Sequence, residues 1–226
     1  MPPLYEGRVG PVSGEASGMT TGRLEAFSDG VFAVAITLLV LDLRVPDPGR
    51  LDGSLAHALG QEWPSYAAYA VSFLVIGIIW ANHHGMMDLI ARANRQLALI
   101  NLVLLMTVVL IPFATALLAK YLRHNNADAH FAAAVYSAVM LAMGASFAWL
   151  WIYVSRGRLL IAGFTDEELR RITVRFTSGT PLYVVALGLA FVSAPACLAL
   201  HGALAVFYSL AERGVGMTRP AGLTPD

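Results

Sequence analysis

One segment near the N-terminus, residues 27–43, constrains the fold of this chain most strongly because it is almost purely apolar. As an α-helix, these 17 residues would be about 26 Å long, which nearly crosses a hydrocarbon core of roughly 30 Å. Its first turns nevertheless carry Ser28 and Asp29, and polar groups this close to lipid are costly. We therefore predict a membrane helix whose polar side chains have partners elsewhere in the protein.

The composition of the whole chain points to the same class of protein. Of its 226 residues, 57% are hydrophobic and 13% are charged, whereas a typical soluble domain has about 25% charged residues. Lys and Arg together number 15, as do Asp and Glu, so the chain lacks the basic excess that attracts nucleic acid. We therefore expect an all-α integral membrane protein that contacts the lipid bilayer and no nucleic acid.

Further apolar segments follow the first one along the chain. They are residues 63–84, 96–119, 131–154 and 173–211. The last of them contains 39 residues and would form a helix of about 58 Å, twice the thickness of a bilayer core. It must therefore contain two passes, and we expect the break at Pro195, with the final pass at residues 196–211. The sequence thus predicts six transmembrane helices.

Turn and cap residues predict where these helices begin and end. Pro112 predicts a kink in the third apolar segment, and Thr165 with Glu168 forms a capping-box pattern that starts the helix leading into the fifth pass. Residues 44–62 are rich in Pro and Gly and are predicted to be a loop, and residues 85–95 a short polar link. The predicted organisation is a flexible cytosolic N-terminal tail at 1–22, a six-helix transmembrane domain at 23–211, and a flexible cytosolic C-terminal tail at 212–226.

The distribution of positive charge predicts the orientation, because cytosolic loops are enriched in Arg and Lys. If both termini are cytosolic, the inner flanks contain Arg8, Arg23, Arg92, Arg95, Arg156, Arg158, Arg170, Arg171, Arg175, Arg213 and Arg219. The outer flanks then contain only Arg44, Arg50, Lys120 and Arg123. This asymmetry places both termini in the cytosol and agrees with an even number of passes.

The predicted topology brings together polar residues that are far apart in the sequence. The first and third helices begin at the cytosolic face, and the second helix ends there. We therefore expect one polar layer near that face, formed by Asp29, His83, His84 and Asn101.

This polar layer allows several interpretations besides packing. His83, His84 and Asp88 have ligand-type side chains, but adjacent histidines point about 100° apart on a helix, which disfavours a shared metal ion. Ser28, His83 and Asp29 have the residue types of a membrane-embedded hydrolase, if nucleophile and base meet. An intramembrane carboxylate such as Asp29 also suits a proton relay or a coupling-ion site. We prefer a hydrogen-bonded structural layer, without metal or cofactor.

The apolar part of the first helix suggests a different role. Val34, Leu38 and Leu41 recur at i, i+4 and i+7 and share one face, with Thr37 beside them. If four copies of this helix met at an axis, that face would form apolar rings, which can gate ions by dewetting. Asp42 would then form a carboxylate ring that attracts cations at the outer mouth. A lipid-facing helix would show the same pattern, so periodicity alone does not decide.

The segment RLEAFSDGVFAVAITLLVLDL at 23–43 closely resembles the first-helix signature of the transmembrane protein 175 (TMEM175) family. These proteins are lysosomal potassium channels, with a prokaryotic branch of single six-helix repeats. The residues at the family's R-x-x-x-F-S-D motif are Arg23, Phe27, Ser28 and Asp29. The residues that resemble its partners on the second and third helices are Trp80, His83 and Asn101.

The resemblance implies a homotetramer in a prokaryotic plasma membrane. Its first helix is expected to line a pore that conducts potassium and also admits other monovalent cations. It implies constrictions at Val34, Leu38 and Leu41 and a hydroxyl layer at Thr37. Val34 departs from the Ile or Leu that is more usual there, so we expect a wider innermost ring. The chain is thus expected to be no enzyme. The alternatives of a secondary transporter, for which no repeat between the two halves is evident, and of a hydrolase stay open at this point.

Overall fold

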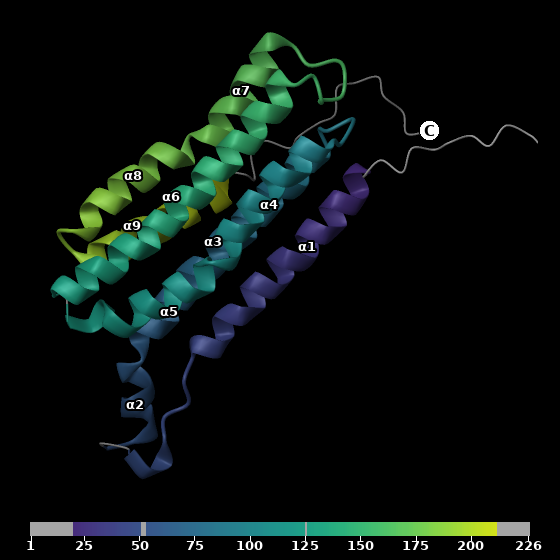
Figure 1. Cartoon of the computed structure of the whole chain (residues 1–226). Helices are drawn as coiled ribbons and strands as arrows, with labels where there is room; N and C mark the ends of the chain where they lie inside the picture. Colours follow the sequence, from purple (N-terminus) through teal and green to yellow (C-terminus); the bar gives the residue numbers. More distant parts are fainter. Residues whose placement is uncertain (1–19, 51–52, 125, 212–226) are drawn as a thin grey trace, which may run out of the picture.

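A computed structural model of the chain describes residues 20–50, 53–124 and 126–211, and the elements named in these parts are all helices, joined by short links (Figure 1). The predicted tails at 1–22 and 212–226 lie outside the described residues, except for positions 20–22, where the first helix starts. The elements are α1 (Thr21–Leu38), η1 (Leu39–Asp42), η2 (Pro48–Arg50), α2 (Leu55–Gln61), α3 (Trp63–Met87), α4 (Arg95–Val109), α5 (Ile111–Tyr121), η3 (Leu122–His124), α6 (Ala127–Arg156), α7 (Asp166–Thr177), α8 (Gly179–Ala190) and α9 (Ala194–Ala211).

Five helical stretches in the described part of the chain are long and apolar enough to cross a membrane. They are Thr21–Asp42, Trp63–Met87, Arg95–Tyr121, Ala127–Arg156 and Asp166–Ala190. Each corresponds to one of the first five predicted passes. The helix at the sixth predicted pass, α9, is apolar but shorter than these five.

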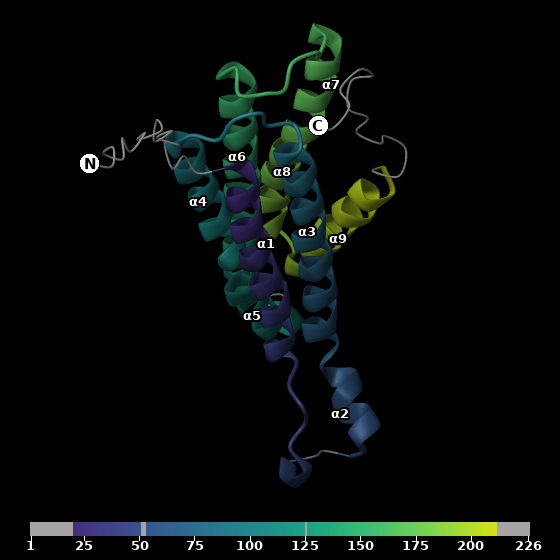
Figure 2. The same cartoon turned by 90° about the vertical axis from the view of Figure 1, so that its right-hand side faces the viewer.

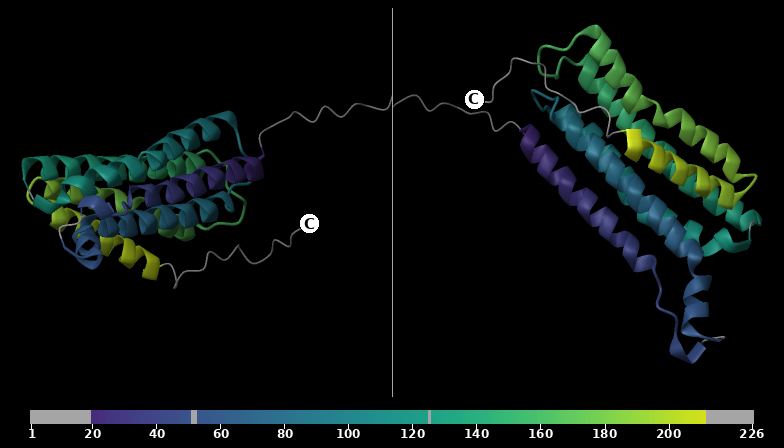
Figure 3. Two further views of the ribbon diagram at one scale, coloured as in Figure 1. Left: turned by 90° about the horizontal axis from the view of Figure 1, so that it is seen from below. Right: turned by 180° about the vertical axis from the view of Figure 1, so that it is seen from behind.

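The long helices run side by side, and α1 lies at one edge of the bundle (Figure 1). It packs against α3 and α4, between which it lies in Figure 2. The core is formed largely by α4, α5 and α6, and the largest fully buried side chain is Trp151 of α6. On the side away from α1, α8 packs against both α6 and α9 (Figure 3). The fold therefore leaves one side of α1 without a neighbour in the described chain.

Two connecting segments pair at the end of the bundle where α1 begins. The amide of Ala91 donates to the carbonyl of Leu159 over 2.8 Å, and the amide of Ile161 donates to the carbonyl of Leu89 over 2.9 Å. These links follow α3 and α6, which the predicted topology ends on the same side of the membrane. The short helix α2 lies at the opposite end (Figure 1).

The breaks between helices follow the proline signals. Pro112 is the second residue of α5, and α4 has already ended at Val109. Pro195 is the second residue of α9, after a turn that separates it from α8. Proline suits these positions because the first turn of a helix has amide groups without intrahelical partners. Both predicted interruptions are confirmed.

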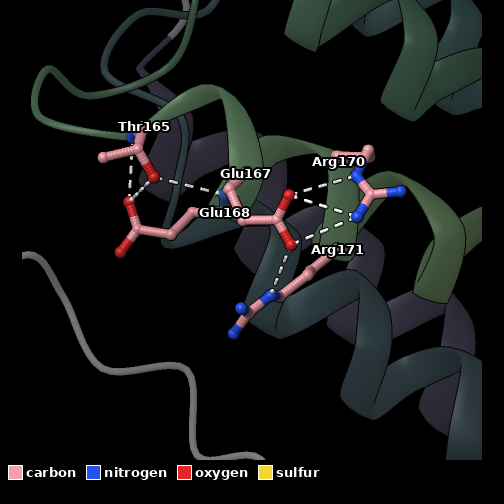
Figure 4. A network of polar contacts seen from close by, with 5 residues as sticks. All are labelled: Thr165, Glu167, Glu168, Arg170 and Arg171. Atoms are coloured by element: carbon pink, nitrogen blue, oxygen red, sulfur yellow. Dashed lines mark hydrogen bonds and ion pairs between the residues drawn. The ribbon is translucent and has the colours of Figure 1, made fainter.

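The predicted capping box at the start of α7 is confirmed (Figure 4). The Thr165 hydroxyl accepts from the amide of Glu168 over 3.3 Å, and the Glu168 carboxylate accepts from the amide of Thr165 over 2.8 Å. In the same first turn, the carboxylate of Glu167 binds both Arg170 and Arg171, which lie one turn further on. This charged turn fixes where the helix starts before it continues towards the apolar α8.

The prediction that residues 44–62 form only a loop is wrong. The segment contains η2 and α2, and the Ser54 hydroxyl caps α2 by accepting from the amide of His57 over 3.2 Å. The reason is local: Pro and Gly are concentrated before position 54, and the following Leu-Ala-His-Ala-Leu residues favour a helix. The link after the second pass is also shorter than predicted, because α3 extends to Met87.

Gly144 allows α6 and α8 to approach closely. A Cβ atom at this position would lie 2.9 Å from Cδ2 of Tyr183, whose ring stacks on the ring of His201. We expect Gly144→Ala to lower the unfolding free energy by about 1–3 kcal/mol, because the Tyr183 ring must move. Gly188→Ala is the matched control, since no atom lies within 4 Å of its Cβ position. Thermal melting of both purified variants tests this, and equal melting temperatures would contradict the close-packing role.

Candidate functional site

The first helix presents two different faces. Its buried face consists of Leu24, Ser28, Phe32 and Ala35, which follow helical spacing and pack against the bundle. The helix starts where the Thr20 hydroxyl accepts from the amide of Arg23 over 3.3 Å. Since only one face is covered, the buried polar group Ser28 and the exposed apolar residues need separate explanations.

Ser28 is the centre of a fully buried hydrogen-bond chain across three helices. Its hydroxyl donates to the carbonyl of Leu24 over 2.8 Å and accepts from Nδ2 of Asn101 on α4, also over 2.8 Å. Oδ1 of Asn101 accepts from Nε2 of His83 on α3 over 2.8 Å. Ser28, His83 and Asn101 have no exposed surface. Because unsatisfied polar groups are costly in such surroundings, this chain ties the first half of α1 to α3 and α4.

A second set of contacts joins α1 to α3 beside this chain. Nε1 of Trp80 donates to Oδ1 of Asp29 over 2.9 Å. Nδ1 of His84 lies 2.7 Å from Oε1 of Glu25. The Trp80 ring also stacks on the ring of His84, with centroids 6.1 Å apart. The structure therefore brings together Asp29, both histidines and Asn101, but the two histidines serve different contacts.

The structure does not bring His83, His84 and Asp88 together as the ligands of one metal ion. Among the described residues, the ligand-type atoms that converge belong to Glu25, Asp29 and His84. His83 faces Asn101 instead, as expected for a neighbour about 100° away on the helix. Glu25 was missed by the sequence reasoning, although its i, i+4 spacing to Asp29 places both carboxylates on one face.

The structure does not show the contacts that the hydrolase interpretation requires. A nucleophilic serine needs a hydrogen bond to its general base. Ser28 is instead bonded to Asn101 and to the carbonyl of Leu24, and His83 is bonded to Asn101. Asp29 is bonded to Trp80 rather than to His83. The three side chains share a layer without the contacts that catalysis requires.

The other two motif residues lie on an exposed face of α1, about 100° round the helix from the buried face. Phe27 is 54% exposed, and Arg23 is also exposed. The exposed face continues along the helix through Val34, Leu38 and Leu41, whose exposed fractions are 57%, 38% and 73%. An apolar face of this length is unusual for a surface in water and is suited to lipid or to a partner helix.

Thr37 lies on the same exposed face, and its hydroxyl is already used as a donor. It donates to the carbonyl of Ala33 over 3.0 Å or to that of Val34 over 2.9 Å. With its proton directed to the backbone, the oxygen keeps lone pairs that are available to a cation. The Thr37 hydroxyl can therefore offer an acceptor but no free donor.

The helix ends in a 3-10 turn, η1, that changes the direction of its last side chains. With three residues per turn, side chains at i and i+3 are aligned. Leu41 therefore follows Leu38 on the exposed face, whereas Asp42 follows the buried Leu39. Asp42 lines a cavity of about 450 Å³ whose other charged residues are Arg44, Glu62, Lys120 and Arg123. The structure thus brings Asp42 to a cavity that it shares with three basic residues and one acidic residue, and separates it from the apolar face.

Comparison with known proteins identifies the family. The family model for the endosomal/lysosomal potassium channel TMEM175 matches residues 23–112. A protein named as a potassium channel from Streptomyces collinus is 53% identical over 189 residues, which covers 83% of this chain and 91% of the relative. A second potassium channel, from Chamaesiphon minutus, is 42% identical over 192 residues and covers 84% of this chain and 94% of the relative.

A solved structure extends this likeness to the fold. The crystal structure of a lysosomal potassium-selective channel TMEM175 homologue from Chamaesiphon minutus matches with a TM-score of 0.77 and 40% identity. The match covers 86% of this chain and 98% of that one. The chain therefore belongs to the TMEM175 family of multi-pass membrane channels, which are not enzymes.

Proposed function

We propose that this protein is a potassium-preferring cation channel that conducts passively. Relatives named as potassium channels match it over nearly their whole lengths. The observation that carries the proposal is the uncovered face of α1, where Val34, Leu38 and Leu41 remain exposed although Leu24, Ser28, Phe32 and Ala35 on another face are buried against the bundle. In the proposed homotetramer, four such faces meet at a central axis.

In this arrangement the apolar side chains close the pore. Rings of Val34, Leu38 and Leu41 exclude water, so ions cannot keep their hydration shells in the closed state. Val34 is smaller than leucine, so its ring is the wider one. Thr37 adds a ring of hydroxyl oxygens between them, and oxygen acceptors are suited to potassium and other monovalent cations. Asp42 and its charged neighbours form an outer rim that we propose influences cation entry.

The hydrogen-bonded layer fixes the cytosolic end of the pore helix. The contacts of Ser28 with Asn101 and of Asp29 with Trp80 resist movement at that end. The constriction residues lie in the outer half of α1 and in η1, which have no such polar ties to α3 and α4 among the described residues. Opening is therefore proposed to be a small rotation or spreading of the outer half about a fixed inner end. Arg23 and Phe27, on the exposed face, are proposed to contact a neighbouring subunit.

The membrane topology is proposed to comprise six passes, with α9 as the sixth and both termini in the cytosol. The paired links after α3 and α6 support a shared side for those ends, and the Arg-rich flanks support the cytosolic assignment. The channel domain is then 23–211, with tails at 1–22 and 212–226. A prokaryotic plasma membrane is the proposed location.

Flux measurements on purified protein test the function against its alternatives. In proteoliposomes with a potassium gradient, we expect electrogenic potassium flux that needs no coupling ion and exceeds sodium flux. Planar-bilayer recordings should then resolve single channels. A flux that requires a second ion would identify a secondary transporter, and the absence of any flux from assembled protein would contradict the proposal.

Asp29→Asn should weaken the assembly more than it changes ion preference. The substitution removes the charge that strengthens the hydrogen bond from Trp80, at a cost of about 1 kcal/mol. We expect a lower melting temperature and an unchanged ratio of potassium to sodium permeability. Asp88→Asn, which alters an exposed carboxylate just after α3, is the matched control. A well-assembled Asp29→Asn protein with altered ion preference would reverse the assignment.

A further inference from the structure

Three ligand-type side chains converge where α1 meets α3, outside the buried hydrogen-bond chain. One ligand atom each from Glu25, Asp29 and His84 lies within 4.8 Å of the others. Glu25 and Asp29 are one helical turn apart on α1, and His84 comes from α3 near its end. The proposed pore does not use Glu25 or His84.

The three side chains differ in what already holds them. Trp80 occupies Oδ1 of Asp29, and the carboxylate has a second oxygen. Glu25 and His84 are bound to each other over 2.7 Å, with 23% and 50% of their side chains exposed. Solvent therefore reaches the cluster, and one ligand is oriented by a hydrogen bond from outside it, as is common at metal sites.

The donor set determines which ions the cluster suits. Two carboxylate oxygens and one imidazole nitrogen match zinc and similar divalent transition metals, whereas calcium and magnesium prefer oxygen ligands only. With bonds of about 2.1 Å in a tetrahedron, neighbouring ligand atoms lie about 3.4 Å apart. Glu25 and His84 must then separate slightly as the ion replaces the proton between them, and rotation of two partly exposed side chains allows this.

We propose that Glu25, Asp29 and His84 form a binding site for one divalent transition-metal ion of the zinc type, with water as the fourth ligand. The ion bridges α1 and α3 at the cytosolic end of the bundle. Binding itself is independent of the proposed channel function. Its consequence for current does rest on that function: an ion that joins α1 to α3 resists movement of the pore helix and reduces opening.

Cobalt binding to purified, tag-free protein tests the site directly, because cobalt in a tetrahedral nitrogen and oxygen environment has a strong visible absorption. We expect one cobalt ion per chain, displaced by zinc, and a higher melting temperature when zinc is present. Glu25→Gln and His84→Gln should each weaken binding by about tenfold or more, since even residues that only hydrogen-bond to metal ligands contribute that much. His57→Gln is the matched control, because His57 is an exposed histidine on α2.

Two outcomes would overturn the site. One is the absence of saturable binding by the unaltered protein. The other is an equal loss of binding in His57→Gln and His84→Gln, which would indicate general surface binding to histidine. Zinc added to the cytosolic side in planar bilayers is the separate test of the consequence, where we expect a current that falls in the unaltered channel and not in His84→Gln. Stoichiometric binding without that effect would support the site and contradict its coupling to the pore.

Discussion

Leu38→Ala should raise the potassium leak of the reconstituted channel by about tenfold or more. In the proposed tetramer, this substitution shortens four apolar side chains in one ring, so water and ions enter the closed pore more easily. A tenfold rise needs the barrier to fall by only about 1.4 kcal/mol, which is less than the usual value of burying one leucine side chain. Liposome flux at zero applied potential measures the leak, and single-channel recording measures the closed-state current.

A matched leucine separates pore effects from general damage. Leu182 on α8 is 36% exposed in the single chain, almost the same as the 38% of Leu38. Leu182→Ala should therefore leave the leak unchanged. Leu41→Ala should act like Leu38→Ala, and Val34→Ala should have a smaller effect because less side chain is removed. Unchanged conductance across all three positions would remove the gate assignment.

Asn101→Ala should produce the largest loss of stability among single changes in the buried hydrogen-bond chain of Ser28, Asn101 and His83. It removes the donor to Ser28 and the acceptor of His83, both of which are fully buried. Each buried group left without a partner costs about 1–3 kcal/mol, so we expect a loss of about 2 kcal/mol or more. Thermal melting followed by size-exclusion chromatography should show early loss of the assembled protein.

Asn82→Ala is the control for this prediction. Asn82 lies on α3, close in sequence to His83, but it is only partly buried and its carbonyl oxygen accepts from Arg175 over 3.3 Å. We expect a much smaller change in melting temperature. If Asn101→Ala had as high a melting temperature as Asn82→Ala, the buried hydrogen-bond chain could not be what ties α1 to its neighbours.

Much of the fold could be predicted from the sequence because bilayer thickness sets a length that apolar segments must match. The first five passes, the breaks at Pro112 and Pro195, and the capping box of Thr165 all depend on local signals of this kind. The helix α2 was missed because Pro and Gly early in its segment obscured the helix-forming residues that follow. A seven-residue helix is too short for periodicity to reveal.

The polar layer was predictable for a different reason. Alternating passes fix which helix ends share a membrane face, so Asp29, His83 and Asn101 could be placed at one depth without any contact information. Which atoms bond could not be predicted, because it depends on the rotation of each helix about its axis. For that reason the prediction from sequence did not place His84 against Glu25, which is its contact in the structure.

The C-terminal end of α1 illustrates a limit of periodicity. An α-helix would direct Asp42 about 100° from Leu41, towards the same general side as the exposed face of Val34, Leu38 and Leu41. The change to a 3-10 turn aligns Asp42 with Leu39 instead. No residue in this apolar segment marks where the α-helix ends, so the turn depends on packing against α3 and α5 rather than on local sequence.

The central claim is that the uncovered face of α1 lines a space shared by identical subunits. Cryo-electron microscopy of the purified protein in lipid nanodiscs measures this directly. The account predicts four copies around one axis, with the side chains of Val34, Leu38 and Leu41 directed towards it. An assembly in which these three side chains contact lipid, away from any symmetry axis, would contradict it.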